Sequence, residues 1–238
     1  MARELARQGR WRRLALYAAA VITVFAASWW LTGSARAALG LAVIAIGVLV
    51  AISTRRNDDA AKWRRGAVGE RSTARYLRPL ERRGYTVLHD RALDRPGDTA
   101  NIDHLVIGPC GPVVVDSKNW HRHTMVKARR GRVFVGRTKG AKIVAATALE
   151  RRRVTQGLSA DIGAPVTAHA VLAIHGARLP YWRRPEIEGI PLLRARQVRR
   201  WITGLPAVHD AATVARLAEA AARRFPAYVA PADPSIRD

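Results

Sequence analysis

The chain opens with two long apolar runs and only afterwards takes on the mixed pattern of a globular domain. Residues 14–31 are apolar apart from Thr23 and Ser28, and residues 37–52 contain no polar side chain. A membrane-spanning helix needs about 20 largely apolar residues. The two runs therefore predict a transmembrane helical hairpin with a tight turn between the helices, and the lipid bilayer is the first expected partner.

Basic residues on both sides of the hairpin predict its orientation. Residues 1–13 form a basic N-terminus with five Arg, residues 53–65 carry five Lys or Arg, and the turn has only Arg36. Cytoplasmic flanks carry such an excess, so we expect a multi-pass protein of the cell membrane with its N-terminus and main domain in the cytoplasm. Two alternatives are a signal peptide cleaved near Ala35-Arg36-Ala37 and a pair of buried helices in a soluble protein.

The rest of the chain alternates predicted helices and strands. After residues 53–65, a linker or helix extension, the pattern gives helices at 62–78 and 141–159 and strands at 85–89, 102–107, 112–118 and 166–174, with a basic hairpin at 125–135. A short strand at 190–193 and helices from 196 and at 210–224 follow. We expect an α/β fold with a mixed central sheet flanked by helices. The main domain is 66–177, residues 178–225 pack on it, and 226–238 form a flexible tail.

Composition adds a strong positive charge to this picture. The chain has 41 Lys and Arg against 18 Asp and Glu, a formal charge of +23. Residues 1–52 hold six Arg and one Glu, so an excess of +18 lies in the rest of the chain. A hydrophobic content of 49% excludes disorder of the whole chain. The single cysteine, Cys110, excludes an intramolecular disulfide and a cysteine-rich zinc site.

Two carboxylates are predicted to face each other in the central hairpin. If Ile107 pairs with Pro112 across the turn Gly108-Pro109-Cys110-Gly111, the same register places Asp103 opposite Asp116. Like charges on directly opposed residues are destabilising, so a raised pKa or a bound cation must compensate. Lys118 lies two residues after Asp116 and therefore on the same face.

A further carboxylate, Glu70, falls inside a predicted apolar helical stripe. Burying a carboxylate is costly unless it has a partner or a metal, so we expect Glu70 to point into the same site. The alternative is that it forms surface ion pairs with nearby arginines. The stripe is made of Trp63, Ala67, Ala74 and Leu77.

These segments resemble the nuclease-related domain (NERD) family, a branch of the restriction-endonuclease-like fold with a PD-(D/E)xK active site. The resemblance rests on Gly66-Ala67-Val68-Gly69-Glu70, Asn101-Ile102-Asp103-His104 and Val115-Asp116-Ser117-Lys118-Asn119-Trp120. It implies hydrolysis of phosphodiester bonds with Mg²⁺ (or Mn²⁺) held by Asp103, Asp116, Glu70 and the carbonyl of Ser117. Lys118 would orient or activate water. Nucleases of this fold often act as dimers, so a homodimer is one partner to test.

The remaining polar residues suggest a binding surface. The basic hairpin suits contacts with DNA phosphates, through Lys127, Arg129, Arg130 and Arg132. A solvated face or attraction to anionic lipid headgroups would explain it equally. His104 should be a packed or hydrogen-bonded residue. The leading hypothesis is a membrane-anchored, metal-dependent nuclease acting on DNA. The alternative is a non-catalytic nucleic-acid-binding or membrane-scaffold module that retains the fold.

Overall fold

A computed structural model describes residues 2–93, 101–129, 132–180 and 185–229. The chain divides into two compact units, Met1–Trp63 and Arg64–Asp238. The first holds the N-terminal helices and the second holds the α/β domain. Each unit is described by itself below.

The first unit is a helical hairpin. Helix α1 spans Ala2–Thr32, and α2 begins at Ala35, so the turn is only Gly33 and Ser34. Gly33 adopts a left-handed conformation with φ 61°, which favours glycine at this tight connection. In the described part, Ala35–Ser53 is long and apolar enough to cross a membrane, whereas Leu16–Thr32 is a shorter apolar helix. The predicted hairpin is therefore present, and a double crossing stays a prediction.

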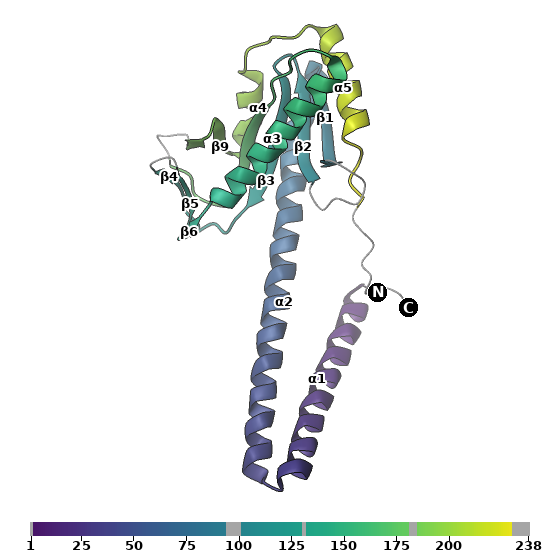
Figure 1. Ribbon diagram of the computed structural model, residues 1–238, viewed down its shortest axis with the longest axis vertical. Helices are drawn as coiled ribbons and strands as arrows, with labels where there is room; N and C mark the ends of the chain where they lie inside the picture. Colours follow the sequence, from purple (N-terminus) through teal and green to yellow (C-terminus); the bar gives the residue numbers. More distant parts are fainter. Residues whose placement is uncertain (1, 94–100, 130–131, 181–184, 230–238) are drawn as a thin grey trace. The chain divides into compact units, whose positions relative to one another are not determined.

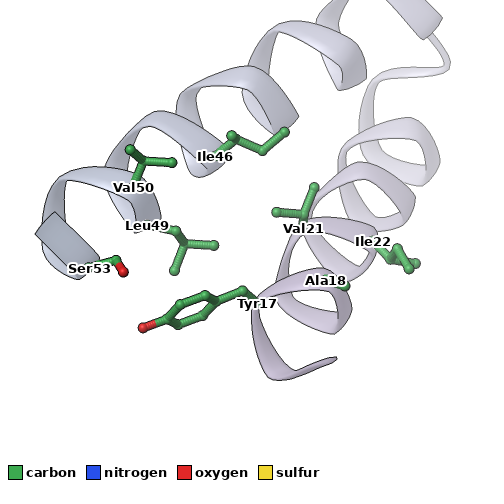
Figure 2. Close-up of a pocket in the computed structure, with 8 residues that line it drawn as sticks. All are labelled: Tyr17, Ala18, Val21, Ile22, Ile46, Leu49, Val50 and Ser53. Carbon is green, nitrogen blue, oxygen red and sulfur yellow. The ribbon is translucent and has the colours of Figure 1, made fainter. Parts of the chain in front are cut away.

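Apolar side chains of the two helices line a hollow of about 500 Å³ in this unit. Figure 2 shows Val21 and Ile22 of α1 and Ile46 and Leu49 of α2 along its sides. Most of the large apolar side chains here are exposed, Trp30 to 83% and Leu31 to 74%. Exposure of this kind is costly in water and is normal in lipid.

Helix α2 is a single helix over Ala35–Leu77 and continues through residues 53–65. The sequence predicted either a linker or a helix extension for this segment, and the structure shows the helix extension. The helix passes into a short 3-10 helix, η1 (Arg78–Arg83), which ends at Gly84 with φ 79°. This C-cap redirects the chain into the first strand.

The second unit is built on a mixed six-stranded sheet with the strand order β1-β2-β3-β7-β9-β8. Its strands are β1 (Thr86–Ala92), β2 (Asn101–Gly108), β3 (Gly111–Asn119), β7 (His169–His175), β8 (Glu186–Ile187) and β9 (Ile190–Arg194). Strands β1, β2 and β3 are antiparallel, and β3, β7 and β9 are parallel to one another. The predicted α/β class and mixed sheet are confirmed.

The register of the central hairpin agrees with the prediction from sequence. Ile107 pairs with Pro112, and the pairing runs back along the strands to His104 with Val115. Gly111 has φ 88°, and a Cβ on Gly108 would lie 2.0 Å from the Tyr85 ring. The backbone of the turn therefore requires glycine at position 111, and the packing of Tyr85 requires it at position 108. Cys110 between them is buried at 2% exposure.

Helices cover both faces of the sheet. Helices α3 (Ala141–Ile162) and α5 (Ala211–Arg224) pack on the face formed by residues such as Leu105, Val114 and Leu172, and Figure 1 shows α3 lying along the strands. The C-terminal end of α2, η1 and α4 (Ala195–Thr203) cover the other face, which includes Val115 and Val171. The alternation of strand residues therefore separates two apolar cores.

A small second sheet contains the basic hairpin, with β4 (Val126–Arg129), β5 (Arg132–Val135) and β6 (Thr138–Lys139).

The end of the described chain departs from the expected flexible tail. Tyr228 donates its backbone N–H to the carbonyl of Asp90, and the carbonyl of Pro226 accepts from Ala92. Strand β1 is at the edge of the sheet and has free backbone groups to offer, so residues 226–229 bind it. Residues 230–238 lie outside the described part of the chain.

Candidate active site

The acid pair lies at the point where β2 and β3 leave their shared ladder. The backbone pairing of the two strands ends at His104 and Val115, and Asp103 and Asp116 are the residues that directly adjoin this last pair. Asp103 Oδ2 accepts a hydrogen bond of 2.8 Å from the backbone N–H of Ser117. Asp116 is only 3% exposed. The structure therefore brings together the two carboxylates that the sequence placed in register.

Both oxygens of Asp116 have partners on the α3 face of the sheet. The ammonium of Lys118 donates to Oδ1, and the hydroxyl of the fully buried Thr147 donates to Oδ2 at 2.7 Å. Lys118 follows Asp116 by two residues on β3, and Thr147 belongs to α3. Strand β3 thus places an acid and an amine on the face of the sheet that α3 covers, and Thr147 of α3 holds the acid by a hydrogen bond.

Burial and the charges of neighbouring groups shift the pKa values of Asp103 and Lys118. Desolvation, followed by the charge of Asp116, raises the pKa of Asp103 to about 7. Burial alone would lower the pKa of Lys118, but the charge and hydrogen bond of Asp116 outweigh it, and the pKa is raised. Lys118 therefore stays protonated at neutral pH, while Asp103 holds its proton more tightly than an ordinary aspartate does.

Sequence reasoning missed a third acid, Glu150 of α3. Its Oε2 is buried and has no hydrogen-bond partner in the described residues. Desolvation, followed by the charges of Asp116 and Asp103, raises its pKa to about 9. A helical-stripe test would have found it, because Ile143, Thr147, Glu150 and Val154 follow spacings of four, three and four.

Glu70 is not on the buried face of α2, where the sequence pattern placed it. Within residues 64–77, the part of this helix that belongs to the second unit, the buried positions are Gly69, Thr73 and Leu77, and Glu70 is exposed. The stripe is rotated because Gly69 packs against Asn119, where a Cβ would come within 2.8 Å. A close approach of this kind is invisible to a count of apolar residues.

The charges of the site still affect the pKa of Glu70. Partial desolvation, then the charge of Asp90 on β1, raises its pKa, with smaller effects from Lys118 and Asp116. Asp90 has φ 51°, a left-handed conformation uncommon for a residue other than glycine. It lies between the β1 residues that pair with His104 and Ile102, and so opposite Asp103. Asp90 is a second acid that sequence reasoning overlooked.

A chain of hydrogen bonds supports the site from the α2 face. His89 contacts His104 (Nδ1 to Nδ1, 2.8 Å), His104 contacts Ser117 Oγ (3.3 Å), Ser117 donates to Thr73 (2.8 Å), and Thr73 contacts His175 (2.7 Å). Burial lowers the pKa of all three histidines, that of His104 to about 3. Neutral rings can then donate in one direction along the whole chain. His104 is thus a hydrogen-bonded residue, as expected.

The basic hairpin is described only in part. Lys127 and Arg132 are exposed, and the backbone of Arg129 pairs with that of Arg132. Arg130 lies outside the described residues. The structure leaves the predicted DNA contacts as predictions.

The donor set fits a hard divalent cation. Carboxylates, together with the Ser117 carbonyl that the family resemblance implies, are the oxygen ligands that Mg²⁺ and Mn²⁺ prefer, and an unpartnered buried oxygen of Glu150 is the kind of atom that an ion or its water would satisfy. Among the residues described, no three His, Cys, Asp or Glu side chains form a ready cluster for a metal. Water and substrate oxygens would therefore have to complete the coordination.

The cluster lies in a region of the chain that matches a known protein family. Residues 65–174 match the family model of the nuclease-related domain, so this part of the chain is a nuclease-related domain. An uncharacterized protein of Bacillus anthracis is 37% identical over 79 residues, which cover 33% of this chain and 37% of that relative. The chain thus matches little more than a third of the relative's length. No solved structure matches the chain significantly.

Proposed function

We propose that the nuclease-related domain hydrolyses phosphodiester bonds in DNA with the help of Mg²⁺ or Mn²⁺. The observation that carries the proposal is the Asp103, Asp116 and Lys118 cluster, which lies within the matched family region. An acid pair next to an amine is suited to a reaction in which a cation and a developing negative charge must both be stabilised.

Each residue then has a defined task. Asp103 and Asp116, with the Ser117 carbonyl and Glu70 at the margin, would hold the cation. When bound, the cation polarises the phosphate and lowers the pKa of water. Hydrolysis joins the water oxygen to phosphorus, breaks the bond to the leaving oxygen, and moves a proton from the water to the leaving group. Lys118, held beside Asp116, stabilises negative charge on the phosphate oxygens.

The proposal is tested with full-length protein in detergent micelles. Plasmid and linear DNA are incubated with Mg²⁺ or Mn²⁺, and cleavage is followed on gels for the wild type, Asp116→Ala and Glu219→Gln. Glu219 lies on α5 with a side chain 72% exposed, so its variant controls for the loss of a surface charge. We expect loss of cleavage only in Asp116→Ala. Cleavage that persists unchanged in that variant refutes the assignment.

Two observations favour a second function, non-catalytic binding of nucleic acid. Lys118 is paired directly with Asp116, and no ready metal cluster is present among the described residues. A basic protein with such a site could bind phosphates without turnover. Salt-sensitive DNA binding, without metal-dependent cleavage and unchanged in Lys118→Ala, would support this reading.

We propose that the N-terminal hairpin anchors the domain in the cell membrane, with the N-terminus and main domain in the cytoplasm. The apolar segment Ala35–Ser53 and the arginine-rich flanks support this. The protein should stay in the membrane fraction after alkaline carbonate washing. Its release would contradict membrane integration.

A further inference from the structure

The starting point is the buried oxygen of Glu150 that has no hydrogen-bond partner. A buried polar atom without a partner destabilises the fold, and such atoms are rare enough in folded proteins to require an explanation. Oε2 of Glu150 is one such atom in the part of the chain described.

The helix places Glu150 next to the acid pair by a specific contact. Thr147 donates to Asp116 at 2.7 Å and also bonds back to Ile143. Glu150 lies three residues later, and residues three apart are neighbours on one helix face. The bond that fixes α3 on Asp116 therefore turns Glu150 toward the same site.

We propose that Glu150 is an acidic residue of the cation site and contacts the ion through one of the ion's water molecules. This inference rests on the proposed metal-dependent function. Mg²⁺ keeps several of its waters in protein sites, and a water that donates to Oε2 would supply the missing partner. A water-mediated role also agrees with the absence, among described residues, of three acids close enough to hold an ion directly.

Two other carboxylates in the described part of the chain do not share this arrangement. Asp161 pairs with Arg224, and Asp210 accepts from the backbone of Thr213 as the N-cap of α5. Both have partners that explain their positions. Glu150 instead lies among the two aspartates and the amine, where a cation would relieve repulsion between carboxylates.

The experiment measures metal affinity without using catalysis. Full-length protein in detergent micelles is titrated with Mn²⁺, and free Mn²⁺ is followed by its electron paramagnetic resonance signal. The variants are Glu150→Gln, which keeps the shape but not the carboxylate, Glu150→Asp, which keeps a shorter carboxylate, and Glu219→Gln as the exposed control. Residues that hold metal ligands or waters from outside the coordination sphere typically contribute 10- to 100-fold to affinity.

We expect Glu150→Gln to weaken Mn²⁺ binding about tenfold, Glu150→Asp to recover part of the loss, and Glu219→Gln to bind as the wild type does. Equal affinity of the wild type and Glu150→Gln overturns the inference and leaves the proposed function standing. If Glu150→Gln fails to fold, Glu150→Asp is compared with Asp116→Ala, measured in the same way. A partial loss of affinity in Glu150→Asp, smaller than that in Asp116→Ala, supports the water-mediated contact, and wild-type affinity in Glu150→Asp, or a loss as large as that in Asp116→Ala, overturns it. A wild type that binds no Mn²⁺ removes both proposals.

Discussion

Replacing Glu150 by Gln should stabilise the metal-free protein at neutral pH and leave it unchanged in acid. Glutamine resembles the protonated acid in shape and charge but never has to be kept protonated. The ordinary pKa of the Glu150 side chain is 4.5, and the folded site raises it to about 9. The wild type therefore takes up a proton on folding throughout the range between these values.

The size of the effect follows from the linkage between protonation and folding. Each pH unit between the two pKa values costs about 1.4 kcal/mol. At pH 7, which is about 2.5 units above the ordinary value, the cost reaches up to about 3 kcal/mol. Below pH 4.5 the acid is neutral in both states, so the cost vanishes. The contribution of Glu150 to stability is thus lost as the pH rises toward 9.

Thermal unfolding of the full-length protein in detergent, with EDTA and at pH 4, 7 and 9, measures this difference by tryptophan fluorescence. A change of 1 kcal/mol shifts Tm by about 2–4 °C in a domain of this size. Glu150→Gln should melt up to about 10 °C above the wild type at pH 7, and the gap should close at pH 4. Melting temperatures that differ equally at all three pH values would refute the reasoning, as would a pH-dependent gap in Glu219→Gln.

Two further substitutions test the packing around the site. Gly176 has φ 69°, and a Cβ there would lie 2.0 Å from the carbonyl oxygen of Trp120, so Gly176→Ala should cost more than about 2 kcal/mol in chemical denaturation. Gly163→Ala, with a similar φ but open space, should cost only about 1 kcal/mol; equal costs would contradict the clash. Thr73→Val removes the hydrogen bonds that Thr73 makes with Ser117 and His175 and should lower stability by about 1–3 kcal/mol. An unchanged midpoint would show that the chain of hydrogen bonds contributes nothing.

The sheet and the acid pair could be predicted because they depend on local signals. A four-residue turn between two apolar runs fixes the register of β2 and β3 as far as His104 and Val115, and extending that register by one residue brings Asp103 and Asp116 together. Lys118 follows from strand alternation. These predictions need no knowledge of how distant segments pack.

The helices that complete the site were harder to predict for a physical reason. The face of α2 is set by a close approach at Gly69 and by hydrogen bonds of Thr73, neither of which adds apolar character. Oε2 of Glu150 is buried because α3 packs on the sheet at Asp116. Short segments such as β8 pair through two residues, too few to leave a periodic pattern.

Because Cys110 is buried, the rate at which its thiol reacts with a reagent can report opening of the central hairpin. The thiol is 2% exposed in the turn of the central hairpin, and burial raises its pKa. Maleimide reagents need an accessible thiolate, so they should react with Cys110 only when the hairpin opens. A cysteine introduced on the surface can therefore be labelled selectively in the folded protein, and the slow reaction of Cys110 itself reports how often the central sheet comes apart.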